Sequence, residues 1–219
     1  MSSEIARFNM IEQQVRPWNV LRPEVLDTLA RVPREAFVPA HLVGLAHSDT
    51  DIPLNTRGAV MMSPKVEAKL VHDLELTGSE NVLEIGTGSG YSSALLARHA
   101  KQVVTVEIDP ELADTAKQRL SSMGINNVVV VTGDGANPST SSGHGPYDAI
   151  VLSGSVGEVP EPLLNLLTPS GRLLCICGGE PIMQATLCFA AAASQPRRVL
   201  WDMNAPRLLN FVDAPAFVF

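Results

Sequence analysis

The chain has 219 residues and a formal net charge of −7, with 45% hydrophobic and 18% charged residues. The length suits one domain with an appendage, and the net negative charge without a Lys/Arg cluster argues against nucleic acid as a partner. No apolar run approaches the roughly 20 residues of a membrane span, and the polar first residues do not resemble a signal peptide, so we expect a cytoplasmic protein with no membrane partner.

Residues 1–30 predict two helices. Apolar residues recur at helical spacing over residues 5–15, and Arg16-Pro17-Trp18 breaks this pattern. A second helix is predicted over residues 23–30, with a proline in its first turn. We interpret Trp18 and Phe37 as packing anchors, with a contact to substrate as the alternative.

Residues 46–63 predict a long loop, because they show little periodicity and contain several turn-forming residues. Loops of this length in a compact domain are often functional. A helix follows from Pro64, with Val66, Leu70 and Leu74 on its apolar face, and it ends before Gly78.

The stretch from Asn81 to Asp109 predicts one βαβ unit. Its first strand is expected over residues 82–85, its helix over 91–99 and its second strand over 103–106, and such units are right-handed. Between the first strand and the helix stand three glycines: Gly86, Gly88 and Gly90.

These glycines and the nearby acidic residues predict a nucleoside site. Glycine permits a tight turn and a close approach of ligand to backbone, and free N–H groups at a helix N-terminus favour a negative ligand group. Glu107 ends the second strand, where a carboxylate can accept hydrogen bonds from both hydroxyls of a ribose. We therefore expect a nucleoside with an anionic or zwitterionic tail.

Three interpretations of this turn are open. The nicotinamide dinucleotide fingerprint, G-x-G-x-x-G, is one residue longer, and Glu84 would repel its pyrophosphate. A turn without a ligand leaves Glu84 and Glu107 unexplained. The pattern E-x-G-x-G-x-G followed by an acidic strand end instead resembles motif I of class I S-adenosylmethionine methyltransferases, whose cofactor carries an ammonium group.

The alternation of helices and strands continues to about residue 177. Ser153 is expected just after the end of one strand, at the edge where ligands bind in doubly wound sheets. In order, the sequence predicts a helix over 110–120, strands over 128–131 and 147–152, a helix over 160–167, a turn over 168–171 and a strand over 173–177.

The C-terminal tail predicts antiparallel edge strands over residues 199–201, 205–211 and 217–219. The expected fold is thus α/β: a Rossmann-like doubly wound sheet, mostly parallel with antiparallel C-terminal edge strands, under an N-terminal helical cap. We expect a single compact unit in which residues 1–77 form the helices and substrate-side loop, and residues 78–219 form the cofactor-binding core.

A second resemblance covers residues 22–180. The segments VLDTLARVPREAFVP, DIPL, VLEIGTGSGY, GDG and PYDAI occur in this order and resemble protein-L-isoaspartate O-methyltransferases. The resemblance implies S-adenosyl-L-methionine as cofactor and S-adenosyl-L-homocysteine as product. It also implies isoaspartyl-containing peptides or proteins as acceptors, in a cleft formed by the N-terminal helices and the loop before Pro64.

The two resemblances imply roles for particular residues. Glu84 would orient the methionine ammonium group, Glu107 would hold the ribose and Asp134 the adenine amino group. The implied cofactor site comprises Glu84, Gly86, Thr87, Gly88, Ser89, Gly90, Tyr91, Glu107, Ile108, Asp134, Gly135 and Ser153.

The implied substrate site comprises Met62, Ser63 and Pro64, and here the chain departs from the family pattern. The family usually has Ser or Thr two residues before the proline, where Met62 stands, and that hydroxyl is implicated in the active site. Ser63 is the candidate catalytic residue. Its alternative role is to cap the helix that Pro64 opens.

The expected reaction is carboxyl O-methylation of L-isoaspartyl residues in damaged proteins. A carboxylate acceptor is already a nucleophile at pH 7, which fits a sequence without an evident Ser-His-Asp set. One alternative is a methyltransferase of the same fold with a different, small-molecule acceptor, favoured by the apolar Met62. Another is a non-catalytic protein that binds the cofactor.

The chain has three cysteines, which could be core residues or could take part in metal or redox chemistry. Cys175 and Cys177 alternate in a predicted buried strand, so their side chains share one face, and Cys188 follows later. We interpret them as core residues, with metal or redox chemistry as the alternative; no metal site is predicted, because no further ligands stand nearby.

Overall fold

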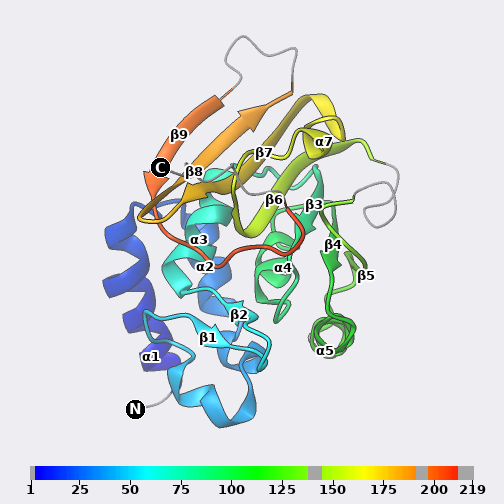
Figure 1. Ribbon diagram of the computed structural model, residues 1–219. Coiled ribbons are helices and arrows are strands. Elements are labelled where there is room, and N and C mark those ends of the chain that lie inside the picture. Colours follow the sequence, from blue (N-terminus) through cyan, green and yellow to red (C-terminus); the bar gives the residue numbers. More distant parts are fainter. Residues whose placement is uncertain (1–2, 138–144, 191–196, 212–219) are drawn as a thin grey trace.

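The structure is a computed structural model that describes residues 3–137, 145–190 and 197–211. The described residues form a seven-stranded sheet with the order β5-β4-β3-β6-β7-β8-β9 (Figure 1). Its strands are β3 (Asn81–Ile85), β4 (Gln102–Glu107), β5 (Val128–Thr132), β6 (Tyr147–Val156), β7 (Leu167–Gly179), β8 (Ile182–Phe189) and β9 (Arg197–Asp202).

The order of the strands confirms a doubly wound sheet. The chain passes outward from β3 through β4 to β5, returns to β6 on the other side of β3, and continues to β7, all in parallel. β8 and β9 then add antiparallel strands. The winding reverses between β3 and β6, and in such sheets the crevice at this reversal is where ligands bind.

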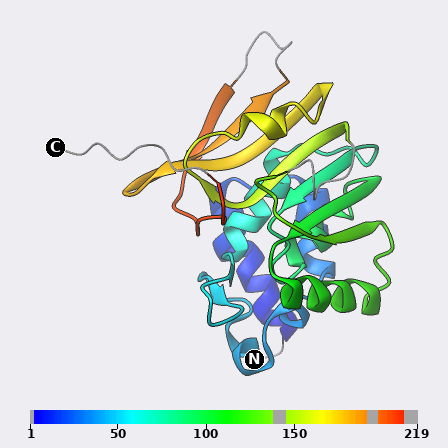
Figure 2. The same cartoon turned by 45° about the vertical axis from the view of Figure 1, so that its right-hand side comes forward.

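Helices cover one face of the sheet more fully than the other. The N-terminal helices, α3 and α4 share one apolar core with that face, and they lie together beneath the sheet in Figures 1 and 2. A second core on the opposite face includes α7. The helices are α1 (Ser3–Met10), the π-helix η1 (Ile11–Val15), the 3-10 turns η2 (Arg16–Trp18), η3 (Arg34–Phe37) and η4 (Ala40–Leu45), and the α-helices α2 (Pro23–Arg31), α3 (Pro64–Asp73), α4 (Tyr91–Leu96), α5 (Pro110–Ser122) and α7 (Glu161–Leu164).

The N-terminal aromatic residues pack as anchors. Trp18 meets Trp201 of β9 edge to face, with ring centroids 6.3 Å apart, and Phe37 meets Tyr91 in the same manner at 5.4 Å. These contacts join the N-terminal helices to both the sheet and α4. The proposed division of the chain at residue 77 stays a prediction.

β6 and β7 are both longer than predicted. β6 continues through Ser153 to Val156, past an irregularity in its pairing with β7. β7 begins at Leu167, so the predicted turn over residues 168–171 is wrong, and α7 is shorter than the predicted helix. A side chain at Gly171 would place its Cβ 2.9 Å from the carbonyl oxygen of Tyr147, so bare backbone is what lets the two strands approach there.

The C-terminal part differs most from the prediction. β8 was not predicted at all, whereas residues 199–201 do lie in the edge strand β9. Residues 205–211 do not form an edge strand. They leave β9, cross to the carboxyl end of β6 and make one isolated bridge there, between Arg207 and Ser155 (Figure 1). Residues 217–219 lie outside the described part.

The loop over residues 46–63 contains a short hairpin of β1 (Ile52–Pro53) and β2 (Val60–Met61). Ser63 stands at the N-cap position of α3, but its hydroxyl makes no capping hydrogen bond. Its backbone N–H instead donates to Asp51 Oδ1 at 2.8 Å, which ties the end of the loop to its beginning.

The three cysteines are free and share the apolar core on the α7 face. Cys175 and Cys188 are buried, and the half-buried Cys177 donates to Thr186 at 3.4 Å. The described residues contain no group of three or more His, Cys, Asp or Glu that could hold a metal ion. None of the helices in the described part is both long and apolar enough to cross a membrane.

A buried ion pair supports the loop from beneath. Arg34 and Glu67 are both buried, and the Arg34 guanidinium also donates to the carbonyl oxygens of Ala46, at 2.9 Å, and Met62, at 2.5 Å. The guanidinium carbon lies 4.8 Å from the ring centroid of Tyr91. Arg34 therefore holds both ends of the loop against α3 and α4. Burial raises the pKa of Glu67 to about 7, although the Arg34 guanidinium opposes the rise.

This pKa predicts a pH-dependent stability. Because folding raises the pKa of Glu67 from 4.5 to about 7, the folded state holds the proton more tightly, and the associated stability is lost as pH rises through that interval. Chemical denaturation measures the free energy of unfolding of the wild type minus that of Glu67→Gln. We expect this difference to fall by roughly 2–3 kcal/mol between pH 5 and pH 8. Glu158→Gln, which replaces an exposed glutamate, is the control. A flat difference for Glu67→Gln would contradict the assignment.

Candidate active site

The turn after β3 has the backbone that the glycines predict. Gly86 and Gly90 have φ of +93° and +87°, a region that residues with a Cβ rarely adopt. A Cβ on Gly90 would also lie 3.1 Å from the Cβ of Ala116 on α5, so this glycine lets α4 and α5 pack closely. Gly86 N–H donates to Val106 O at 2.9 Å, which fixes the turn against the end of β4.

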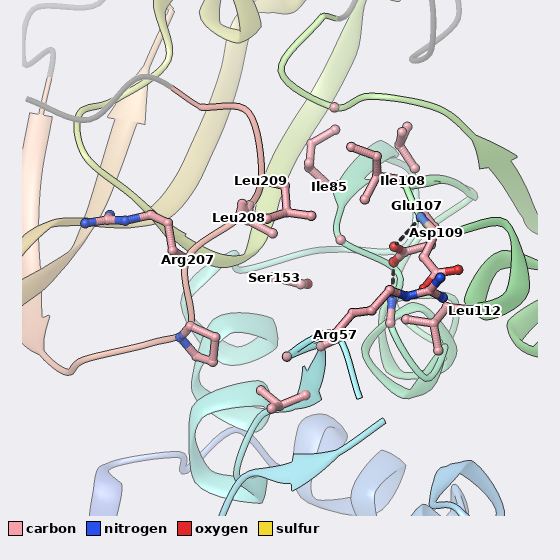
Figure 3. Close-up of a pocket in the computed structure, with 18 of the residues that line it drawn as sticks. Arg57, Ile85, Glu107, Ile108, Asp109, Leu112, Ser153, Arg207, Leu208 and Leu209 are labelled. Atoms are coloured by element: carbon pink, nitrogen blue, oxygen red, sulfur yellow. Dashed lines mark hydrogen bonds and ion pairs between the residues drawn. The ribbon is translucent and has the colours of Figure 1, made fainter. Parts of the chain in front are cut away.

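A cleft of about 380 Å³ opens beside this turn, at the carboxyl ends of β3, β4 and β6. Figure 3 shows Glu107 and Asp109 on one side of it and Leu208 and Leu209 opposite. Of the residues predicted to bind the cofactor, those that line the cleft are Gly86, Gly88, Glu107, Ile108, Asp134, Gly135 and Ser153. The others, Glu84, Thr87, Ser89, Gly90 and Tyr91, do not line it.

Glu107 is held in place by backbone donors. Its side chain is buried, Oε2 accepts from Gly88 N–H at 2.8 Å, and Oε1 accepts from Asp109 N–H at 3.0 Å (Figure 3). Two bonds to backbone N–H groups fix the plane of a carboxylate, yet each oxygen retains a second lone pair. Glu107 therefore presents a fixed acceptor to the cleft.

Glu84 lies beneath the turn. It is fully buried, and its carboxylate accepts hydrogen bonds from the hydroxyls of Ser93 on α4 and, at 2.7 Å, Ser153 on β6. Burial raises the pKa of Glu84, and these hydroxyl donors oppose the rise. Because Ser153 both lines the cleft and donates to Glu84, it connects the buried carboxylate to the cleft surface. The predicted contact of Glu84 with an ammonium group stays a prediction.

Asp134 follows β5 and faces the far end of the cleft. Its Oδ1 accepts from Ala136 N–H and its Oδ2 from the side-chain amide of Asn210, both at 3.0 Å. Next to it, a Cβ on Gly135 would lie 2.3 Å from Cγ2 of Ile85. Only glycine fits there, so the backbone after Asp134 lies directly on β3.

Two sides of the cleft were not predicted. One is the tip of the β1–β2 hairpin, where Arg57 forms ion pairs with Asp109 and, at 3.1 Å, with Glu111 at the N-terminus of α5. Asn55 donates to the same Asp109 oxygen at 3.0 Å. The sequence does indicate Asp109 as the N-cap of α5, because it precedes a proline. No local sequence pattern predicts its contacts with Arg57 and Asn55, which are distant in the chain.

The other unpredicted side is the C-terminal segment, residues 205–211. Leu208 lies against the glycine turn, since a Cβ on Gly86 would be 3.0 Å from its Cδ2. A Cβ on Gly154 would be 2.8 Å from the same atom. These glycines therefore make room for Leu208 as well as for ligand.

The predicted substrate residues lie apart from this lining. Met62, Ser63 and Pro64 are buried at the end of the loop and do not line the cleft. The lining on their side comes from residues 57–60 of the hairpin. Their part in binding an acceptor stays a prediction.

Comparison with known proteins identifies the family of this chain. The family model described as protein-L-isoaspartate(D-aspartate) O-methyltransferase matches residues 6–194. The chain belongs to this family. It is 42% identical to protein-L-isoaspartate O-methyltransferase 2 of Pelobacter propionicus, over 84% of this chain and 80% of that protein.

Solved structures share the fold of this methyltransferase. A protein-L-isoaspartate O-methyltransferase superimposes with a TM-score of 0.76 at 22% identity, covering 94% of this chain and 65% of that one. A candidate protein-L-isoaspartate O-methyltransferase from Plasmodium falciparum, in complex with S-adenosyl-L-homocysteine, superimposes with a TM-score of 0.75 at 18% identity. The match covers 95% of this chain and 98% of that one. These two likenesses show the fold, and membership of the methyltransferase family gives S-adenosyl-L-methionine as the cofactor.

The cleft fits this cofactor chemically. Glu107 offers an acceptor for ribose hydroxyls, Asp134 one for an adenine amino group, and the bare backbone of Gly86 and Gly88 permits close approach of the amino-acid tail. Ile108 lines the cleft with an exposed apolar side chain, and its predicted contact with the cofactor stays a prediction.

Replacement of Glu107 by alanine tests the cleft directly. We expect binding of S-adenosyl-L-homocysteine to weaken by roughly 1–3 kcal/mol, because ribose hydroxyls would lose their partner. Isothermal titration calorimetry measures this. Asp114→Ala, which removes an exposed carboxylate of α5 outside the cleft, is the control and should bind as the wild type does. Equal affinities for both variants would remove Glu107 from the site.

Proposed function

We propose that this methyltransferase transfers the methyl group of S-adenosyl-L-methionine to the free carboxylate of L-isoaspartyl residues in proteins or peptides. Membership of the family supports this acceptor. The chemistry of the cleft carries the proposal further, because it suits an acceptor that is already ionised.

The lining of the cleft supplies no evident general base. Among the described residues that line it there is no His, Cys, Lys or Tyr. Its carboxylates are Glu107, Asp109 and Asp134, and each is engaged by backbone N–H groups or by neighbouring side chains. A hydroxyl or amine acceptor would require a base to remove its proton, whereas a carboxylate at pH 7 does not.

The protein's contribution would then be alignment and exclusion of water. The cofactor brings an activated methyl group on a sulfonium. We propose that Glu84 acts through Ser153 and the glycine turn to position the tail of the cofactor, that Glu107 holds the ribose, and that Asp134 holds the adenine. In-line transfer depends on holding the reacting atoms in one geometry, and closing the cleft excludes water.

The acceptor would approach from the hairpin side, past residues 57–63. Met62 affects which acceptor can bind, because its side chain is a thioether at a position where the family usually has a hydroxyl. Met62 is buried and its carbonyl oxygen is held by Arg34. The apolar side chain of Met62 favours a second candidate function: methylation of a different, small-molecule acceptor.

Transfer of labelled methyl from S-adenosyl-L-methionine to an isoaspartyl peptide tests the proposal, with the normal aspartyl peptide as control. We expect base-labile label on the isoaspartyl peptide alone, because a methyl ester hydrolyses in base. Label on neither peptide, together with confirmed cofactor binding, would contradict this acceptor and favour the second candidate.

Met62→Ser separates the two candidate functions. If isoaspartyl residues are the acceptor, we expect the variant to keep kcat/KM within about tenfold of the wild type, because Arg34 holds the backbone rather than the side chain at this position. Isoaspartyl activity that appears only in Met62→Ser would show a retained cleft whose hydroxyl was lost.

A further inference from the structure

The C-terminal segment, residues 205–211, is fastened along its length to the carboxyl ends of the strands. Ser155 N–H donates to Pro206 O at 2.7 Å, and Leu208 N–H donates back to Ser155 O at 2.9 Å. Ser155 Oγ donates to Ala205 O at 2.7 Å, and Arg207 donates to Gly178 O at 2.9 Å. The beginning and middle of the segment are therefore fixed to β6 and β7.

The end of the segment is fastened differently. After Leu208 the chain leaves the strands and turns at Asn210, whose φ is +65°. Asparagine is among the few residues that adopt this left-handed conformation readily. The turn directs the Asn210 amide back to Oδ2 of Asp134, 3.0 Å away and beyond the end of β5. This bond spans the cleft from its β6 side to its β5 side.

Asn210 also fixes one oxygen of the Asp134 carboxylate. Ala136 N–H holds Oδ1 and the Asn210 amide holds Oδ2, so both oxygens of the carboxylate have a set direction. A carboxylate fixed before the ligand arrives loses less rotational freedom on binding, and an exposed hydrogen bond of this kind adds little to the stability of the fold.

We propose that Asn210 is a positioning residue for the adenine end of the cofactor. It acts through Asp134, whose carboxylate it orients. The proposal rests on the adenine role assigned to Asp134 under the proposed function. It makes the C-terminal segment part of the cofactor site in this chain.

The test compares two ligands by isothermal titration calorimetry. S-adenosyl-L-homocysteine carries the 6-amino group that Asp134 would accept, whereas S-inosyl-L-homocysteine carries an oxygen in its place. Asn210→Gly removes the amide and keeps the left-handed backbone accessible. We expect it to weaken S-adenosyl-L-homocysteine about fivefold, the effect of one hydrogen bond, and to change S-inosyl-L-homocysteine by less than about twofold.

Asn210→Asp adds a diagnostic that a structural role would not share. It places a second carboxylate beside Asp134, so we expect a loss of roughly twentyfold for S-adenosyl-L-homocysteine at low ionic strength, shrinking several-fold in 1 M salt as the repulsion is screened. The melting temperatures of both variants should stay within about 2 °C of the wild type, because the bond is exposed.

Gln184→Ala is the matched control. It removes another exposed amide–carboxylate hydrogen bond, from Gln184 to Asp202 at 3.0 Å between β8 and β9, outside the cleft. It should leave both affinities unchanged.

Three results would overturn the proposal. If Asn210→Gly binds both ligands with wild-type affinity, Asn210 has no role in binding. If it loses equal affinity for the two ligands, Asn210 does not act on the adenine amino group. If Asp134→Asn does not change the preference of the protein for the amino ligand over the inosyl ligand, the adenine assignment fails, and the role of Asn210 fails with it. The isoaspartyl assay is independent of all these measurements.

Discussion

The bare backbone of the turn after β3 is the constraint on which the rest of the site depends. Gly86 and Gly90 take positive φ, and neighbouring groups leave no room for a Cβ at either position without displacement. The turn is joined to β4 by Gly86 N–H on Val106 O and by Gly88 N–H on Glu107. The same backbone therefore creates space for a ligand and fixes the carboxylate predicted to bind its ribose.

The other sides of the cleft come from segments that are distant in sequence and joined to it by charged or polar bonds. Arg57 of the hairpin reaches Asp109, and Asn210 of the C-terminal segment reaches Asp134. In both cases the acceptor is a carboxylate just beyond the carboxyl end of a strand. The acidic residues at this edge of the sheet thus serve two purposes, since they face the cleft and anchor the segments that enclose it.

The loop before α3 depends on a buried ion pair rather than on the cleft itself. Arg34 pairs with Glu67 and holds the carbonyl oxygens of Ala46 and Met62, so the path of the loop is set from beneath. Replacing one partner of a buried pair leaves the other as an uncompensated buried charge, which destabilises the folded state. At position 62 it is the backbone carbonyl oxygen, not the side chain, that Arg34 holds.

The sequence by itself determined the βαβ unit, the parallel strands β3 to β7, the glycine turn and Glu107 at a strand end, because these follow from periodicity, strand ends and the special backbone of glycine. Asp134 was predicted from the resemblance to the family. The sequence also predicted β9, through the apolar residues 199–201. It did not reveal β8, the longer β6 and β7, or the path of residues 205–211, and it placed Glu84 and Met62 in the site without showing that neither lines the cleft. Only the tertiary structure decided these points. Arg57 and Leu208 enclose the cleft, and Asn210 reaches Asp134, through contacts across the fold. Such contacts depend on which strand ends come together rather than on local pattern.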